Sequence, residues 1–291
     1  MSIFKTISFI LRHPFNKNDK FSALLRFIKW QINVRLNPYP VLYPFTENTT
    51  LLIKKGMTGA TGNLYCGLVE YEDMSFLLHL LRESDLFLDV GANIGAYTIL
   101  ASGETGARTF AFEPIPDTFN ILNTNVFINQ IENKVKIFNI GIGKEKGKIK
   151  FTASLDTINH VAFDASGKQI EVDVDTLDNM LTDMPILVKI DVEGYETEVI
   201  KGANKLLANT TLKAIIIELN GSGLNYGYSD KEIHEMILSY GFKPHAYNPA
   251  LRSLSELESF GQYNTLYLRD IPFINERVKT ARKVRVGQKA I

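Results

Sequence analysis

Residues 86–102, LFLDVGANIGAYTILAS, decide the fold of this chain. They open with an apolar run that closes on Asp89, continue through a turn flanked by Gly91 and Gly95, and end in a helical pattern that reaches Ala101. An apolar run, a glycine-flanked turn and a helix are typical of the unit that opens a nucleotide-binding α/β domain. We therefore predict a buried strand with a ligand-binding loop at its carboxyl end.

The spacing of this loop favours one class of cofactor over another. Dinucleotide-binding loops read G-x-G-x-x-G, because a pyrophosphate must sit on the helix N-terminus. Here the spacing is G-x-N-x-G, and no glycine stands where the third would be. The middle residue, Asn93, is of the non-glycine type that best tolerates a positive φ. S-adenosylmethionine carries no phosphate, so this shorter loop is sufficient for it.

Polar residues at predicted strand ends complete the cofactor hypothesis. Glu113 lies 24 residues beyond Asp89 and closes the next apolar run, residues 109–112. A carboxylate at that strand tip can accept both ribose hydroxyls. We expect Asp89 to orient the glycine loop or to meet the methionine amino group, with a turn-capping carboxylate as the alternative. Asn139, near the end of a predicted strand at 135–140, is placed near the adenine.

Alternation of strands and helices along the chain predicts a doubly wound, mostly parallel sheet. The run at 186–191 is almost continuously apolar, as expected of a parallel strand buried on both faces. The other expected strands are 51–53, 148–151, 170–174, 212–219, 243–247 and 265–268. The expected helices are 73–81, 116–125, 197–207 and 231–240.

Composition limits the class of protein. The chain has 291 residues and 45% apolar content, enough for one sizeable core and a small appendage. The single cysteine, Cys66, excludes an internal disulfide framework and fits a reducing compartment. No uncharged apolar run approaches the ~20 residues of a spanning helix. Because Lys5, Arg12 and Pro14 interrupt the N-terminal apolar stretches, we expect no cleaved signal peptide and a cytoplasmic protein.

The charges are unevenly distributed, although the net charge is zero. Residues 1–36 hold seven bases and one acid, and residues 277–291 hold six bases and no acid. The part between them holds 31 acids and 19 bases. A neutral chain is not a general polyanion binder, so no nucleic-acid partner is expected. The basic ends predict peripheral contact with the inner membrane surface, with ends folded back on the acidic body as the alternative.

Residues 21–36 predict an amphipathic helix. Its apolar positions are Phe21, Leu24, Leu25, Ile28, Ile32 and Leu36. The favoured interpretation is a helix that docks on its own domain. The alternative is an interfacial helix on an anionic leaflet, with Trp30 near the headgroups. Three prolines between 38 and 44 then mark a linker.

Several stretches, in order, resemble the motifs of the FkbM family of S-adenosylmethionine-dependent O-methyltransferases. They are LFLDVGANIGAYT, AFEPIPDTF with LNTNVFIN, VDTLDNML and LVKIDVEGYETEVIKGA. Together they cover roughly residues 70–222, and KIDVEGYE is the most discriminating of them. The resemblance implies a class I methyltransferase (Rossmann-like) fold with a seven-stranded sheet. We therefore divide the chain into a basic amphipathic extension at 1–50, a methyltransferase domain at 51–270 and a basic tail at 271–291.

The resemblance also implies methylation of a hydroxyl, often on a sugar, with S-adenosylmethionine as cofactor. We expect an acceptor in a surface glycan or glycolipid, or a small molecule. An NAD(P)-dependent sugar oxidoreductase and a non-catalytic S-adenosylmethionine-binding module are the alternatives. The sequence leaves the oligomeric state open.

The reacting groups are expected after the buried strand at 186–191. Lys189 and Asp191 lie two residues apart, so they share a face of that strand. Asp191 and Glu193 are predicted to hold or deprotonate the acceptor, and a structural Lys189–Asp191 ion pair is the alternative. Glu218 and Asn220, at the next strand tip, are predicted to bind acceptor hydroxyls.

Two further expectations concern the chemistry. His160 is nominated as a catalytic base, since a sugar hydroxyl needs a base that titrates near neutral pH. No metal site is predicted, although a divalent ion on the carboxylates of Asp191 and Glu193 is an alternative.

Overall fold

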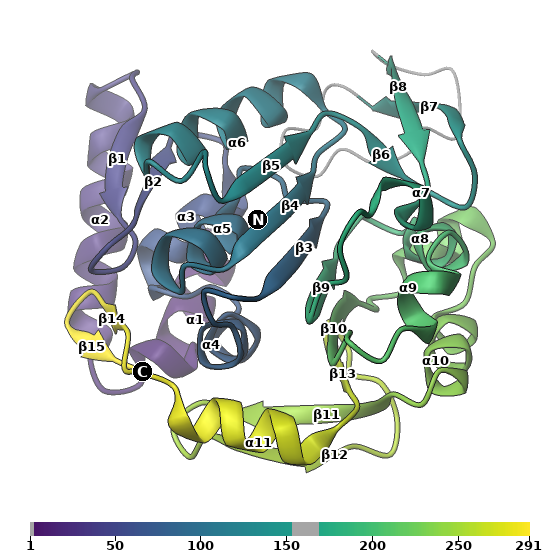
Figure 1. The fold of residues 1–291 in the computed structure, drawn as a ribbon. Helices are drawn as coiled ribbons and strands as arrows, with labels where there is room; N and C mark the ends of the chain where they lie inside the picture. The colour runs from purple at the N-terminus through teal and green to yellow at the C-terminus, as the bar shows by residue number, and fades with distance from the viewer. Residues whose placement is uncertain (1–2, 153–168) are drawn as a thin grey trace.

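The centre of the protein is an eight-stranded sheet in the order β12-β11-β13-β10-β9-β3-β4-β5 (Figure 1). The structure is a computed structural model, which describes residues 3–152 and 169–291. Strands β5, β4, β3, β9 and β10 run parallel, and β13 enters antiparallel between β10 and β11. The sheet strands are β3 (Leu86–Val90), β4 (Arg108–Phe112), β5 (Val135–Phe138), β9 (Leu187–Ile190), β10 (Ala214–Glu218), β11 (Lys243–Asn248), β12 (Ser253–Glu256) and β13 (Asn264–Leu268).

This topology confirms the predicted doubly wound α/β sheet of the class I methyltransferase type. The prediction of seven strands was one too few, because β12 pairs with β11 and adds an eighth strand at the edge. The helices are α1 (Ile3–Arg12), α2 (Lys20–Leu36), α3 (Thr58–Cys66), α4 (Tyr71–Leu80), α5 (Ala96–Ile99), α6 (Pro116–Ile128), α7 (Leu177–Met180), α8 (Glu196–Lys201), α9 (Asn204–Ala208), α10 (Asp230–Ser239) and α11 (Ile271–Thr280).

Smaller strand pairs flank the main sheet. Two hairpins and a three-stranded sheet of order β6-β8-β7 make up this group. Their strands are β1 (Val41–Pro44), β2 (Thr50–Ile53), β6 (Gly141–Ile142), β7 (Gly147–Thr152), β8 (Gln169–Asp175), β14 (Arg285–Val286) and β15 (Lys289–Ala290). The expected insertion strands at 148–151 and 170–174 are thus confirmed as the antiparallel pair β7–β8.

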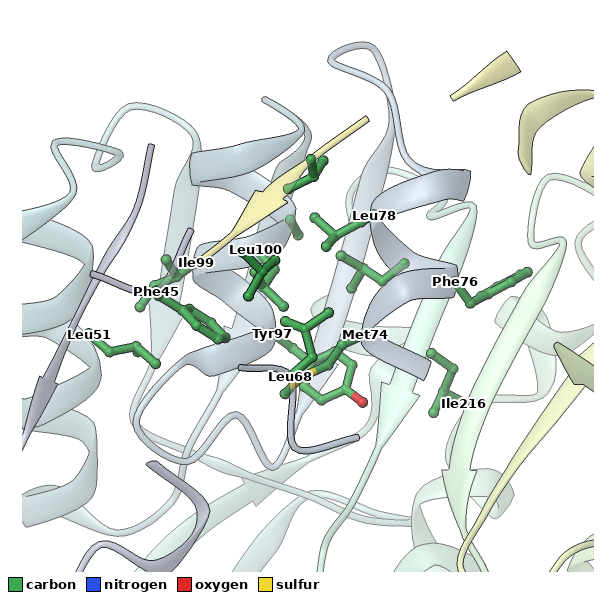
Figure 2. Packing of buried hydrophobic residues seen from close by; sticks show 14 of the residues in the cluster. Phe45, Leu51, Leu68, Met74, Phe76, Leu78, Tyr97, Ile99, Leu100 and Ile216 are labelled. Atoms are coloured by element: carbon green, nitrogen blue, oxygen red, sulfur yellow. The ribbon is translucent and has the colours of Figure 1, made fainter. Parts of the chain in front are cut away.

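Side chains alternate between two apolar cores on opposite faces of the sheet, as the period of a strand requires. Phe87 points to the core that contains α4 and α5, and Leu88 points to the core beneath α8 and α10. Figure 2 shows part of the first core, where Phe76 of α4 lies on the side of Ile216 of β10 and Leu78 points the other way, toward Leu100. Asp89 and Lys189, directly paired in register, therefore share the first face with Phe87.

The structure corrects three local expectations. The glycine-rich piece before residue 67 contains helix α3, which the sequence reading missed. The helix expected at 197–207 is divided into α8 and α9 at Gly202, where a Cβ atom would meet the backbone oxygen of Gly143 at 2.0 Å. The proline-marked linker contains strand β1, which pairs antiparallel with β2.

The helix expected at 21–36 is confirmed as α2, but it docks through a different face. Ala23, Phe27 and Trp30 are buried, whereas most of the predicted apolar stripe is exposed. The favoured interpretation, a helix that docks on its own domain, is therefore confirmed for this face, and the alternative position of Trp30 near lipid headgroups is wrong, because its ring packs inside the protein. None of the helices in the described residues is long and apolar enough to cross a membrane.

The C-terminal residues fold back on the body of the protein. Arg277 forms an ion pair with Asp85 at 2.8 Å, and Arg282 pairs with the buried Glu104 at 2.5 Å. The ammonium group of Lys289 donates to the backbone oxygen of Phe15. Three of the six basic side chains at this end of the chain thus contact the protein itself.

Candidate functional site

Three cavities lie along the carboxyl ends of the parallel strands, as expected for an open α/β sheet. The first, of about 690 Å³, and the second, of about 550 Å³, share Gly91, Asn93 and Asp191. The third, of about 1180 Å³, shares Val69 and Glu70 with the second. A continuous series of cavities thus runs from the end of β4 past β3 and β9 to β10.

The glycine loop separates the first two cavities. Gly91 has a φ of +78°, and a Cβ atom there would lie 1.8 Å from the backbone oxygen of Asp191. The N–H groups of Gly91 and Ala92 both donate to the oxygen of Phe112, at 3.0 and 2.9 Å. Asn93 has a φ of 52°, which agrees with the conformation suggested by the sequence. Only glycine fits at position 91, because any side chain there would collide with the backbone of the turn that follows β9.

Glu113 lies at the rim of the first cavity with a buried carboxylate. Its two oxygens accept hydrogen bonds from the backbone N–H of Asn93 at 3.0 Å and of Ile115 at 2.9 Å. Burial raises the pKa of Glu113 to about 7, although both N–H groups favour the charged form. Each oxygen of an ionised carboxylate has two acceptor positions, so Glu113 can hold the loop and still accept two ligand hydroxyls.

Asp89 is buried at the end of β3 and lines the second cavity. It accepts a hydrogen bond from the hydroxyl of Thr98 at 2.6 Å, which ties the strand to the start of the following helix. Burial raises the pKa of Asp89 to about 6. Asn139 uses its amide to donate to the backbone oxygens of Glu113 and Pro114, at 2.8 and 3.0 Å. Asn139 thus fixes the loop that carries Glu113.

Lys189 and Asp191 form an ion pair of 2.7 Å. Lys189 is almost fully buried, and its ammonium group lies 4.8 Å from the centre of the Tyr97 ring. Burial alone would lower the pKa of Lys189, but the charges of Asp191, Glu70 and Asp89 outweigh it and raise that pKa. The ion pair that the sequence offered as the alternative therefore exists, and Asp191 also lines both the first and the second cavity.

The turn after β9 holds Glu193 in an unusual backbone conformation. Glu193 has a φ of 54°, and its side chain lines the first cavity. Burial, followed by the charge of Asp191, raises the pKa of Glu193 to about 7. Glu196 accepts hydrogen bonds from the N–H groups of Val192 at 3.0 Å and Gly194 at 3.2 Å. Glu196 is thus a positioning residue that the sequence reading missed, although it is the last residue of the KIDVEGYE motif.

The third cavity brings together acidic residues from distant parts of the chain. Glu70, Asp73, Glu218 and His245 line it, and Asn264 donates to Glu70 at 2.9 Å and to Asp73 at 3.0 Å. Burial, followed by the charges of neighbouring carboxylates, raises the pKa of Glu218 to about 8. The Oε2 atom of Glu218 is buried without a hydrogen-bond partner. This carboxyl is therefore equipped to bind a polar ligand group.

His245 was not nominated from the sequence. Its Nδ1 atom lies 2.9 Å from the backbone oxygen of Lys243, which can only accept, so Nδ1 carries the proton of the neutral ring. The Nε2 atom of that tautomer is an acceptor. Asn220 is exposed and accepts a hydrogen bond from the N–H of Ser222 at 2.8 Å, so it shapes the turn after β10.

Two expectations need separate mention. His160 lies outside the described residues. Among the residues that the structure does describe, no three His, Cys, Asp or Glu side chains converge so that they could hold a metal ion.

The chain is similar to known methyltransferases. Residues 89–244 match the methyltransferase FkbM domain family. The hexuronic acid methyltransferase AglP of Haloferax volcanii is 29% identical over 172 residues, which cover 58% of this chain and 67% of that protein. Methyltransferase 1 of Beauveria bassiana is 26% identical over 147 residues and covers 41% of this chain and 59% of that protein.

One solved structure completes the comparison. The crystal structure of methyltransferase FkbM from Methylobacillus flagellatus is 20% identical with a TM-score of 0.45, and the match covers 72% of this chain and 52% of that one. The matched part of this chain thus spans between about half and two thirds of the lengths of these relatives.

Proposed function

The chain belongs to the methyltransferase FkbM domain family and is a methyltransferase; from this premise we propose that its methyl donor is S-adenosylmethionine and its acceptor a sugar hydroxyl. The observation that carries the proposal is the buried carboxylate of Glu113 beside a loop that only glycine can form. The methyltransferase family also disfavours the oxidoreductase alternative.

The residues around the first two cavities fit the proposed donor. Glu113 would accept the ribose hydroxyls, because its oxygens keep acceptor capacity after binding the two backbone N–H groups. Asp89 and Asp191, which line the second cavity, would face the positively charged methionine half. Carboxylates stabilise an ammonium or a sulfonium group in a partly buried site. Hydrophobic side chains such as Ile142 and Phe151 in the first cavity suit an adenine ring.

S-adenosylmethionine supplies an electrophilic methyl group, so the protein must mainly align the acceptor oxygen and remove its proton. Glu193 is the proposed base, since a carboxyl whose pKa lies near 7 is suited to proton removal at neutral pH. Asp191 would hold the acceptor hydroxyl through the oxygen that Lys189 leaves accessible. Lys189 and Glu196 would position these two groups without contacting the acceptor.

The third cavity is the proposed site for the body of the acceptor sugar, and the reacting hydroxyl would extend past Glu70 into the second cavity, toward Asp191. Carboxyl, amide and imidazole groups line the third cavity, and they match the hydrogen-bonding hydroxyls of a sugar. Among the described residues that line it, none is lysine or arginine. An acceptor carboxylate would meet Glu70, Asp73 and Glu218 without a cation to pair with. We therefore propose a neutral or amino-bearing sugar as acceptor, although the relative AglP is a hexuronic acid methyltransferase.

Calorimetry tests the donor. S-adenosylhomocysteine should bind to the wild-type protein, and NAD and NADP should not. Binding of NAD alone would contradict the donor proposal.

A labelled-donor assay tests the acceptor. Mass spectrometry should detect transfer of a deuterated methyl group to neutral or amino-sugar glycans in preference to their uronic acid counterparts. Asp191→Asn and Glu193→Gln should both abolish transfer, and Glu193→Gln should change S-adenosylhomocysteine affinity less than about tenfold, because Glu193 is not proposed to contact the methionine half of the donor. Exclusive labelling of uronic acids, protein or nucleic acid would refute the acceptor proposal. If the protein binds the donor but no acceptor is ever labelled, the non-catalytic alternative is favoured.

A further inference from the structure

The exposed apolar side chains of this protein are concentrated at its N-terminal end. Of the 16 large hydrophobic residues that are exposed in the described part of the chain, ten lie between residues 3 and 42. Half of these ten belong to one face of α2, which we call the outer stripe: Phe21, Leu25, Ile28, Ile32 and Leu36. An exposed apolar surface of this extent marks an interaction site.

Helix α2 has two apolar faces, and only one of them is used within the protein. At 100° per residue the outer stripe occupies an arc of about 80°, roughly opposite Trp30. Trp30, Phe27 and Ala23 are buried against the rest of the protein. The outer stripe contributes nothing to that packing, because Phe21 is 73% exposed and Ile32 is 53% exposed.

Positive charge borders the outer stripe. Lys29 and Arg35 are exposed on its two flanks, and Asp19 is the only acid of residues 1–36. Residues 37–276 hold 31 acids and 19 bases, so this part of the protein has a net negative charge. The net charge of α2 is positive. Apolar residues with flanking bases are the pattern of a helix that lies in the interface of an anionic bilayer.

One flank of the outer stripe, at Arg35, borders a groove that leads toward the proposed acceptor site. This groove, of about 1210 Å³, is lined by residues of α1, α2 and α3, among them Phe9, Phe27 and Tyr65, and by Val69 of the segment that follows α3. Phe9 and Val69 also line the third cavity. The groove therefore leads from the N-terminal helices to the cavity that contains Glu218.

We propose that the outer stripe of α2, with its flanking bases, docks this protein on an anionic lipid surface and so places the third cavity at that surface. The second half of this statement rests on the proposed function, since it makes the acceptor a sugar that is attached to a lipid. A second copy of the chain is the less suitable occupant of the stripe. In a two-fold interface the same patch meets itself, so the positively charged flanks of two copies would be brought together without acids between them.

Vesicle co-sedimentation tests the docking without donor or acceptor, so its outcome is independent of the proposed function. The probes are phosphatidylcholine vesicles with and without phosphatidylglycerol, at low and high salt. Wild-type protein should partition onto the anionic vesicles at least about tenfold more strongly, and salt should weaken this binding.

Two variants locate the surface. The triple variant Phe21→Ser, Ile28→Ser, Ile32→Ser should bind at least about tenfold more weakly. The double variant Lys29→Glu, Arg35→Glu should also bind anionic vesicles more weakly, by at least about fivefold for each of the two bases replaced. The difference from wild type should be smaller at high salt. The matched control is Phe127→Ser with Leu251→Ser, two exposed apolar residues distant in sequence from α2, which should bind as wild type does.

Thermal melting shows whether each variant is folded, and the single change Phe21→Ser replaces the triple variant if that one unfolds. The proposal is overturned if wild-type protein does not pellet with anionic vesicles, or if the stripe variant and the control lose binding equally. It is also overturned if sedimentation velocity shows a dimer that the stripe variant abolishes while vesicles are not bound.

Discussion

Replacement of Glu113 by glutamine tests the cofactor site most directly. The carboxylate accepts two backbone hydrogen bonds, from Asn93 at 3.0 Å and from Ile115 at 2.9 Å. The amide of glutamine can accept one of them, but its NH₂ group faces the other N–H and leaves a buried donor unpaired. Such a group costs ~1–3 kcal/mol, which corresponds to a fall in melting temperature of roughly 2–4 °C per kcal/mol for a chain of this size.

Glu113→Gln should also weaken donor binding directly, in addition to its effect on the stability of the folded protein. Glutamine can accept only one of the two ribose hydroxyls that the carboxylate of Glu113 is proposed to accept. A hydrogen bond to a charged group contributes ~1.5–3 kcal/mol, so S-adenosylhomocysteine should bind about 10- to 150-fold more weakly.

The pH dependence of binding separates a direct contact from a structural role. Burial raises the pKa of Glu113 to about 7, so the free protein carries a neutral carboxyl there below that pH. Ribose hydroxyls donate to the ionised form, and wild-type affinity should therefore increase between pH 6 and 8. This increase should be smaller in Glu113→Gln, because the variant has no proton to lose at that position.

Glu104→Gln is the matched control. Glu104 is also buried, but it pairs with Arg282 and accepts from Thr46, and it lines none of the three cavities. The control should lose stability and retain donor affinity when both are measured by differential scanning fluorimetry and calorimetry. If Glu113→Gln binds S-adenosylhomocysteine within twofold of wild type at pH 8, Glu113 is not the ribose acceptor.

Three further outcomes are expected. Gly91→Ala should reduce S-adenosylhomocysteine affinity more than about tenfold in calorimetry, because the new Cβ atom would lie 1.8 Å from the backbone oxygen of Asp191; unchanged affinity would contradict the tight approach of the loop. Lys189→Met should lower the free energy of unfolding by up to about 3 kcal/mol in urea titrations, since it leaves Asp191 unpaired, and adding Asp191→Asn should restore part of that loss. Burial raises the pKa of Glu196 to about 7 and of Glu218 to about 8, so the folded state holds protons that the unfolded state releases above about pH 4.5. The free energy of unfolding should therefore fall by about 2 kcal/mol or more from pH 5.5 to 8. A rise over that range would refute the burial argument.

The alternation of elements was readable from the sequence because each element depends on residues that are near neighbours in the chain. Residues 86–102 contain the strand, the turn and the helix in one stretch, and the positive φ of Asn93 agrees with that reading. The strand-end positions of Asp89, Glu113 and Asp191 follow from the same local pattern. Since all parallel strands end at one edge of the sheet, their proximity could be inferred before any coordinates.

The protonation of the site could not be read in the same way. The raised pKa of Glu113 depends on its burial, and that of Glu193 depends on burial and on the neighbouring charge of Asp191. The sequence states that these residues are acidic but not how much water reaches them. Likewise, Glu196 looked like an ordinary residue of the motif until its bonds to the turn N–H groups were visible.

The sequence by itself determined the alternation of strands and helices in the parallel part of the sheet, the glycine loop and the acidic residues at the strand ends, because short-range periodicity and spacing encode them. Only the tertiary structure brought Glu70, Glu218 and His245 to one cavity, since these residues are far apart in the chain. Glu218 and His245 meet through the pairing of β10, β13 and β11, and Asn264 of β13 binds Glu70. It also decided which face of α2 is buried. Periodicity shows which apolar residues share a face of a helix, but when both faces are apolar only packing against the rest of the protein selects one of them.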